Sequence, residues 1–177
     1  MHYLFNAEHK AMAEQSVLCW LATADEFCQP NVSPKEIFAI VDDEHIVIAN
    51  IASPQSAKNI RKNEKVCVSF IDVFAQKGFK VFGIASDVKP QATDYKRCVE
   101  PLQKMVGDRF PIHSVFLVRA TIIEPILAPS YRLYPLETTE ASQVRAALET
   151  YGVKRVIGDV KPPPDSPPID LRQHPKG

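Results

Sequence analysis

The chain consists mostly of short apolar runs that polar turns separate. In several runs apolar and polar residues alternate, which is the period of a half-buried strand; Val66, Val68 and Phe70, for example, fall on one face. The runs follow one another closely, so the pattern favours an antiparallel sheet or barrel over a series of βαβ units. We predict six strands, within residues 17–24, 30–41, 45–50, 65–75, 76–88 and 113–127.

Helical patterns lie between and beside these strands. Ser53 and Pro54 suit the N-cap and the first position of a helix, and Gly152 suits a helix end. Pro101 lies inside another helical pattern, where we expect a break or a second helix start. The predicted helices cover residues 1–15, 53–63, 91–106 and 138–153, the last beginning at Thr138 or Thr139.

Residues 1–153 therefore form one predicted domain, mainly β with helices, of the α+β class. Gly78 and Gly83 interrupt the strand pattern of 76–88, where we expect a close backbone approach or a bend. Residues 154–177 are rich in proline and lack an apolar face, so we expect a tail that is extended or disordered.

Composition narrows the classes of partner. The 177 residues are 45% hydrophobic, and Lys plus Arg equals Asp plus Glu at 21 each. Zero net charge argues against nucleic acid or an anionic membrane as partner, because such binding needs clustered positive charge. The sequence shows no signal segment and no membrane-spanning run, so we expect a cytoplasmic protein.

The stretch from Asn50 to Asn59 contains more small hydrogen-bonding side chains than a helix start requires. A helix N-terminus offers unpaired N–H groups and the positive end of the helix dipole, which together attract anions. Additional donors and cations complete a candidate site for a phosphate monoester: Ser53, Gln55, Ser56, Asn59, Lys58 and Arg61. The alternative is that Ser53 only caps the helix and the other side chains are solvated.

Two further groups of residues are candidates for ligand contacts. Ser33 and Lys35 share one face of a predicted strand, where a lysine can meet a phosphate or the polar edge of a ring; alternatively the lysine is solvated. Gln76 and Lys77 precede Gly78, so the chain can approach a flat heterocycle closely. The alternative for this group is a hairpin turn in which Gly78 takes a positive φ.

No motif supports catalysis by side chains alone. The five histidines are scattered, none has metal-ligand spacing, and no Cys-x-x-Cys pair occurs. We therefore predict no metal site and no assigned catalytic residue, and we expect a cofactor to supply any reactivity.

Four of these patches occur in an order that resembles the FMN-binding split-barrel family, the pyridoxamine 5'-phosphate oxidase-like proteins. The resemblance covers residues 17–85 most clearly: an LAT strand, PNVSPK, a strand ending in Asn50, the serine-rich turn, and QKG. The segment APSYRLYP with TTEASQ, from 128 to 143, resembles the C-terminal part of one subgroup.

The resemblance implies an antiparallel split β-barrel that binds FMN as a homodimer, with each flavin at the subunit interface. It implies that Ser33, Lys35 and Asn50 lie beside the ring or ribityl chain. It also implies that Ser53, Ser56 and Asn59 bind the phosphate with Lys58 nearby, and that Gln76 and Lys77 approach from the following strand.

The expected function is that of an FMN-dependent oxidoreductase that uses a nicotinamide or a small reducible substrate. Pro54 and Gln55 stand where the oxidase has a basic pair, so we do not expect oxidation of vitamin B6. Cys28 stands where relatives carry glycine, which puts the shape of that turn in question. The alternatives are a flavin carrier or sensor without turnover, a cofactor-free barrel that binds proteins, and a barrel that binds deazaflavin or haem.

Overall fold

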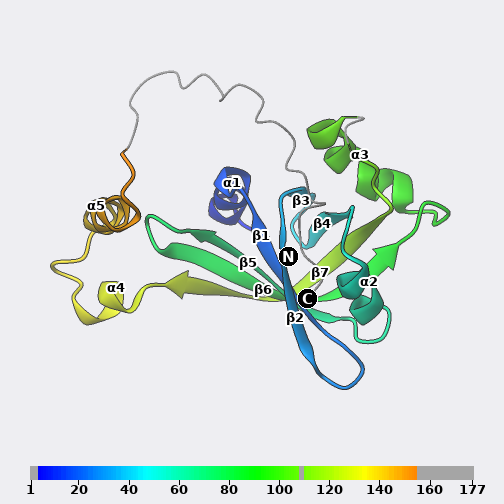
Figure 1. Ribbon diagram of the computed structural model, residues 1–177, viewed down its shortest axis with the longest axis horizontal. Coiled ribbons are helices and arrows are strands. Elements are labelled where there is room, and N and C mark those ends of the chain that lie inside the picture. The colour runs from blue at the N-terminus through cyan, green and yellow to red at the C-terminus, as the bar shows by residue number, and fades with distance from the viewer. Residues whose placement is uncertain (1–3, 108–109, 155–177) are drawn as a thin grey trace, which may run out of the picture.

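A computed structural model describes residues 4–107 and 110–154. Seven strands form one antiparallel sheet in the order β2-β1-β5-β6-β7-β4-β3, and the helices cover its ends and edges (Figure 1). The elements are α1 Ala7–Gln15, β1 Cys19–Ala24, β2 Pro30–Lys35, β3 Phe38–Ile40, β4 His45–Asn50, α2 Pro54–Ile60, β5 Lys65–Asp72, β6 Lys77–Val88, α3 Tyr95–Val106, β7 Ser114–Leu127, α4 Pro129–Leu133 and α5 Glu140–Tyr151. The α+β class and the antiparallel sheet are confirmed; the predicted tail, 154–177, lies outside the described residues except for Lys154.

The predicted single strand over 30–41 is wrong, because this segment forms two strands. β2 pairs with β1 at one edge of the sheet, and β3 pairs with β4 at the other edge. Only Glu36 and Ile37 connect these edges, so Lys35 and Phe38 lie at most roughly 11 Å apart. The sheet must therefore curl until its edges almost meet, which makes it a half-barrel.

The helix over Pro101 also differs from the sequence prediction. α3 is continuous from Tyr95 to Val106 with Pro101 inside it, and it begins later than residue 91. Cys98 and Leu102 are buried against Val47 and Val115 of the sheet. The free energy gained by burying these two side chains outweighs the loss of the backbone hydrogen bond that Pro101 cannot make.

The other helix predictions have mixed outcomes. Thr139 caps α5 by accepting a hydrogen bond from the Ser142 N–H at 3.1 Å, and Gly152 ends it with φ of 65°, both as predicted. The short helix α4 was not predicted, because prolines flank it at both ends of APSYRLYP. No described helix is long and apolar enough to cross a membrane.

The main core lies on the concave face of the sheet, beneath α1 and α2. The rings of Phe70 and Phe79 stack with centroids 4.8 Å apart, and Phe38 meets Phe70 edge-on at 5.3 Å. All four cysteines are free thiols, and burial raises the pKa of Cys19 to about 12. Burial of the thiol thus keeps Cys19 protonated and unreactive.

The glycines of β6 have the predicted role of permitting close backbone approach. A Cβ at Gly78 would meet the Phe70 carbonyl oxygen, and one at Gly83 would lie 2.6 Å from the Arg119 carbonyl oxygen. The pairing of β6 with β7 shifts register next to Gly83. The alternative in which Gly78 takes a positive φ is wrong, because Gln76 takes it instead, with φ of 55°.

Candidate functional site

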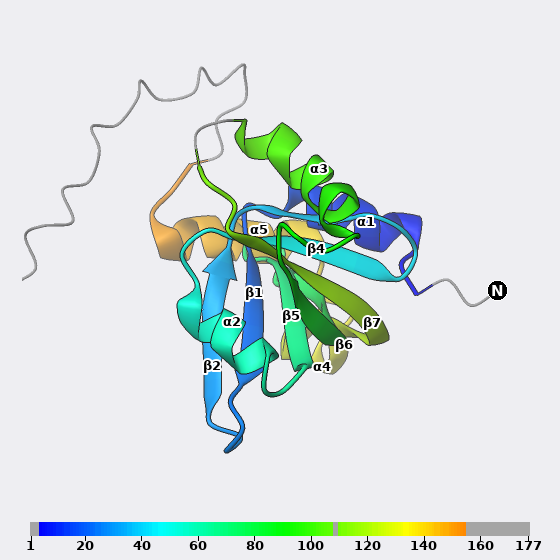
Figure 2. The same cartoon turned by 90° about the vertical axis from the view of Figure 1, so that its right-hand side faces the viewer.

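Helix α2 packs against β1 and β2 (Figure 2). Polar side chains of α2 and of the strands lie together beneath this helix. Most of them are buried, which is unusual for so many polar groups in one place. We call this group the Ser53 corner: Thr23, Asn31, Ser33, Lys35, Asn50, Ser53, Ser56, Asn59 and Ser114. It contains six of the nine predicted site residues.

Ser53 lies at the N-cap position of α2, and Pro54 follows at the first helical position as predicted. The Ser53 hydroxyl makes no cap hydrogen bond to the helix; it accepts one from Lys35 Nζ. The Ser53 N–H donates to Asn50 Oδ1 at 3.3 Å. The interpretation that Ser53 only caps the helix is therefore wrong, since its hydroxyl faces a buried cation.

Lys35 is the central charge of this corner. The residue is only 6% exposed, and its Nζ lies 5.9 Å from the ring centroid of Phe116. Among residues 4–107 and 110–154, no carboxylate lies within 4.0 Å of its Nζ. Burial lowers the pKa of Lys35, because the charged form loses hydration without gaining a counter-ion. An anion beside Lys35 would reverse this penalty.

Ser33, Ser56 and Asn59 connect β2 and α2. The hydroxyls of Ser33 and Ser56 lie 3.3 Å apart, within hydrogen-bond distance. Asn59 Nδ2 donates to Thr23 Oγ1 at 3.0 Å, and Asn59 Oδ1 accepts from Gln55 Nε2 at 2.7 Å. Both ends of the Asn59 amide thus have partners within the chain, whereas the serine hydroxyls can still accept or donate.

A second chain of contacts leads from Asn50 to β6. Asn50 Nδ2 donates to Ser114 Oγ at 2.8 Å, and Ser114 also interacts with the Asp87 carboxylate. Burial alone raises the pKa of Asp87, but Ser114, Lys89 and Arg61 outweigh it and hold the pKa below its usual value. Arg61 Nη1 lies 2.8 Å from Asp87 Oδ2, so this arginine is already paired and does not serve the corner as predicted.

The remaining predicted residues lie outside the Ser53 corner. Lys58 is on the exposed side of α2, where it forms no ion pair with a described residue. Lys77 Nζ lies 3.1 Å from Glu140 Oε2 and 4.8 Å from the ring centroid of Tyr131, while the Gln76 carbonyl accepts from the Ala128 N–H.

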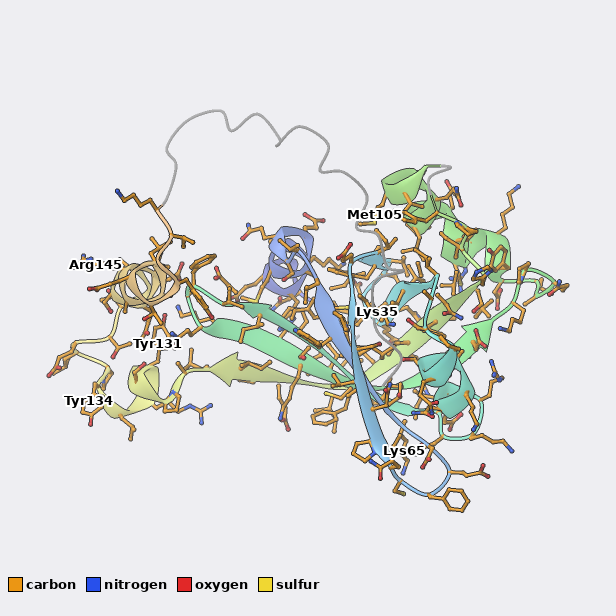
Figure 3. All side chains as sticks on the ribbon, in the orientation of Figure 1. Lys35, Lys65, Met105, Tyr131, Tyr134 and Arg145 are labelled. Carbon is orange, nitrogen blue, oxygen red and sulfur yellow. The ribbon has the colours of Figure 1, made fainter. Side chains whose placement is uncertain are left out.

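Gln76 is the last residue of the β5–β6 turn and Lys77 the first of β6, beside α4 and α5, whereas α2 lies at the other end of the sheet (Figure 1). Lys35 and Tyr131, the ring beside Lys77, are well apart in Figure 3. One chain alone therefore does not bring the two groups of predicted residues together.

Several residues of the corner were missed. Asn31 could have been found, since it precedes Ser33 and Lys35 on the same face of β2, and it lies 3.3 Å from Thr23 Oγ1. Thr23 and Ser114 occur in strand patterns without a signal of their own, and so does Asp87, which lies beside the corner next to Ser114. Their roles depend on neighbours far apart in the sequence.

The corner suits anion binding, because it combines an unpaired buried cation with hydroxyls and a helix N-terminus. It holds no pair of nucleophile and base. Among the described residues, no group of three or more His, Cys, Asp or Glu is placed to hold a metal ion.

Comparisons with known proteins agree on the fold. The sequence pattern of the family described as pyridoxamine 5'-phosphate oxidase matches residues 5–145. A search of curated proteins found no match. Among solved structures, HupZ from Group A Streptococcus is 23% identical with a TM-score of 0.61, over 70% of this chain and 95% of that chain.

Two other similar structures differ in what their names state. An FMN-binding protein from Syntrophomonas wolfei is 15% identical with a TM-score of 0.57, over 66% of this chain and 82% of that one. HutZ from Vibrio cholerae, a heme storage protein, is 18% identical with a TM-score of 0.56, over 72% of this chain and 95% of that one. At these identities the comparisons show a shared fold.

Proposed function

The chain belongs to the pyridoxamine 5'-phosphate oxidase-like FMN-binding split-barrel family, and on that premise we propose that it is an FMN-binding flavoprotein that acts as an oxidoreductase. The observation that carries the proposal is Lys35, a buried lysine that has no carboxylate partner among the described residues and points to the Ser53 hydroxyl. A phosphate dianion at this corner would supply the missing counter-charge.

The donor set fits the phosphate of FMN. Lys35 supplies a cation, and Ser33, Ser53 and Ser56 supply hydroxyls that can reorient toward phosphate oxygens. The N-terminus of α2 contributes the positive end of the helix dipole. Because Pro54 has no N–H, this helix start has one fewer unpaired N–H group. Lys58, exposed on the same helix, adds long-range attraction.

When bound, FMN supplies the redox chemistry with a nicotinamide or a small reducible substrate. The chain itself binds and orients the cofactor. Apart from Lys35, whose ammonium would pair with the phosphate, the corner has no acidic side chain, so water would carry any proton transfer. Turnover distinguishes the oxidoreductase from a flavin carrier or sensor. Oxidation of NADH or NADPH with a dye acceptor should exceed the rate with free FMN, and a rate equal to free FMN would identify a carrier.

The proposal includes a homodimer, in which Gln76 and Lys77 of one chain approach the Ser53 corner of the other. The face of the sheet that points away from the core supports this. An apolar row crosses five strands there, formed by the neighbours Val32, Ala22, Cys67, Phe82 and Ile122. Val32 is 59% exposed and Ile122 is 54% exposed, so a partner that covers the row would bury considerable apolar surface.

Light scattering during size-exclusion chromatography tests the dimer. We expect the wild type at twice the chain mass of 19.8 kDa and an Ile122→Glu variant at the chain mass, with weaker FMN binding. A wild type that stays monomeric while it binds FMN fully would contradict a shared site.

The cofactor is tested by the absorption spectrum of gently purified protein and by titration. We expect a flavin spectrum, and FMN binding about 100-fold tighter than riboflavin, which lacks the phosphate; this ratio corresponds to about 2.7 kcal/mol. A haem spectrum, or equal affinity for FMN and riboflavin, would overturn the proposal. A protein that is colourless as purified and does not bind added FMN would favour a cofactor-free interaction module.

A further inference from the structure

One buried carboxylate lies beside the Ser53 corner and takes no part in the proposed contacts with FMN. Asp87 belongs to β6, and its side chain is only 2% exposed. Two cations contact its Oδ2, Arg61 Nη1 at 2.8 Å and Lys89 Nζ at 2.9 Å. Its Oδ1 is buried too, and among the described residues it has no hydrogen-bond partner of good geometry. Oδ1 is therefore still open to a donor.

Three neighbouring strands place Asp87 in line with the Ser53 corner. In the order β6-β7-β4, Phe116 of β7 lies opposite Asp87, and Asn50 of β4 lies opposite Ser114 of β7. Ser114 comes two residues before Phe116 and so shares its face of the sheet. Ser114 is completely buried, and its hydroxyl interacts with the Asp87 carboxylate. A line of polar side chains thus crosses the sheet from Asp87 through Ser114 to Asn50.

The carboxylate sets the direction of every hydrogen bond in this line, because an ionised carboxylate can only accept. The Ser114 hydroxyl must donate its proton toward Asp87, where Oδ1 is the open acceptor. The Ser114 oxygen is then left to accept from Asn50 Nδ2, which lies at 2.8 Å. This orients the Asn50 amide so that its Oδ1 accepts from the Ser53 N–H at 3.3 Å. The charge of Asp87 thus decides which end of the Asn50 amide faces the turn before α2.

The same carboxylate also holds the far end of α2. Arg61 is the C-cap residue of this helix, and its guanidinium pairs with Asp87 Oδ2. Asp87 is thereby connected to both ends of α2, directly to the C-cap and through the line of side chains to Ser53 at the N-cap. Support of this kind keeps the groups that contact a ligand in one geometry.

We propose that Asp87 is a positioning residue for the phosphate-binding turn. It does not contact FMN; through Ser114 and Asn50 it holds the Ser53 N–H, which leaves the Ser53 hydroxyl to face Lys35 and the phosphate. This inference rests on the proposed function, because it concerns the same corner. Charge alone predicts the opposite effect: a carboxylate near a phosphate site repels the dianion, so its removal would tighten binding.

Asp87→Asn keeps the shape of the side chain and removes its charge. The two cations at Oδ2 retain an oxygen as partner only if the new amide turns its carbonyl toward them, which points its NH2 group at Ser114. The Ser114 proton must then turn to Asn50, whose amide flips and presents its own NH2 group to the Ser53 N–H. Two donors cannot bond, so the turn before α2 loses its anchor.

Two measurements test this role. Flavin fluorescence titration gives FMN affinity, which should fall about tenfold or more in Asp87→Asn. NMR without FMN gives the exchange rate of the Ser53 N–H, which should rise about fivefold or more. Ser114→Ala keeps every charge and removes the link, so it should have both effects, and it decides the test if Asp87→Asn does not fold.

Two controls separate positioning from general effects. Lys89→Gln removes one cation from Asp87 Oδ2 but leaves the line to Asn50, so FMN affinity and Ser53 exchange should change less than about threefold. The Ser142 N–H donates to the Thr139 hydroxyl at the start of α5, and its exchange rate should stay within about twofold in every variant.

The proposal is overturned if folded Asp87→Asn binds FMN as tightly as the wild type or more tightly, or if neither variant raises the exchange rate of the Ser53 N–H. An equal rise at Ser142 would also overturn it, because the effect would then be a general loss of stability. The exchange rates require no FMN. A wild type that binds no FMN would therefore contradict the proposed function, while the rates would still decide whether Asp87 holds the turn.

Discussion

Two of the three predicted site lysines, Lys35 and Lys77, have opposite environments. Lys35 is buried at the end of β2, lacks a described carboxylate partner, and has a pKa that burial lowers. Lys77 is half-buried at the start of β6, pairs with Glu140 at 3.1 Å, and lies over the ring of Tyr131. The sequence presented the two as equivalent candidates.

The difference indicates what each region is built for. A lysine with a carboxylate and an aromatic ring within reach has its charge satisfied by the chain, so it ties α4 and α5 to the β5–β6 turn. A buried lysine without a counter-ion costs free energy in the isolated chain, which binding of an anion relieves. Function is therefore more strongly indicated at Lys35 than at Lys77.

Replacing Lys35 is expected to have the largest effect. Lys35→Met keeps the length of the side chain and removes the charge, so FMN affinity should fall about 100-fold, or about 2.7 kcal/mol. The free energy of unfolding without FMN should stay equal or rise by about 1 kcal/mol, because an unpaired buried cation is removed. Flavin fluorescence titration and urea unfolding measure the two quantities.

Riboflavin serves as the control for this variant. Since riboflavin has no phosphate, its affinity should be the same for the wild type and Lys35→Met. If Lys35→Met binds FMN within threefold of the wild type, the contrast between the two lysines has no functional meaning.

Asn59 tests whether a buried polar residue of the corner acts on folding or on the ligand. Asn59→Ala removes the hydrogen bonds to Thr23 and Gln55, so the free energy of unfolding should fall by about 2 kcal/mol. FMN affinity should fall less than tenfold, because both ends of this amide already have partners. The exposed Lys58→Met on the same helix is the matched control and should change stability by less than about 0.5 kcal/mol. A large loss of FMN binding at unchanged stability would instead make Asn59 a phosphate ligand.

The pH dependence of FMN binding tests whether the charge of Lys35 holds the phosphate. Its pKa in the unliganded fold lies below the usual 10.5, so FMN affinity should fall as pH rises through that lowered pKa, by up to about tenfold per pH unit. Without FMN the sign is opposite: the cost of charging Lys35 is present below its folded pKa and disappears as pH rises through it, so stability should rise. Lys35→Arg, which stays charged, should bind FMN without the alkaline loss. An identical alkaline loss in this variant would assign the titration to another group.

Replacing Lys77 is expected to have the smallest effect. Lys77→Met breaks the ion pair with Glu140, so stability should fall by about 0.5 kcal/mol, as is usual for surface pairs. FMN affinity should fall less than about fivefold. Lys80→Met is the matched control, because Lys80 likewise pairs with a glutamate, Glu124 at 3.0 Å, and lies over the ring of Phe82. A loss of FMN binding that is 50-fold or more for Lys77→Met alone would show that Lys77, which in the proposed dimer approaches the corner from the partner chain, binds FMN directly despite its ion pair with Glu140.

The sequence left open whether Cys28 changes the shape of the turn between β1 and β2, and the structure shows the conformation of this turn. Cys28 takes φ of 64°, so the turn keeps the conformation that glycine favours despite the thiol side chain. That conformation costs a non-glycine residue roughly 1–2 kcal/mol.

The sequence by itself determined most of the strands, several helix ends and the order of the polar patches, because alternation, caps and glycine positions are local properties. The tertiary structure decided the rest. It divided residues 30–41 between the two edges of a curled sheet, and it kept α3 intact across Pro101 by burying Cys98 and Leu102. It also separated Lys35 from Lys77, because burial and counter-ions are set by residues that fold in from distant parts of the chain.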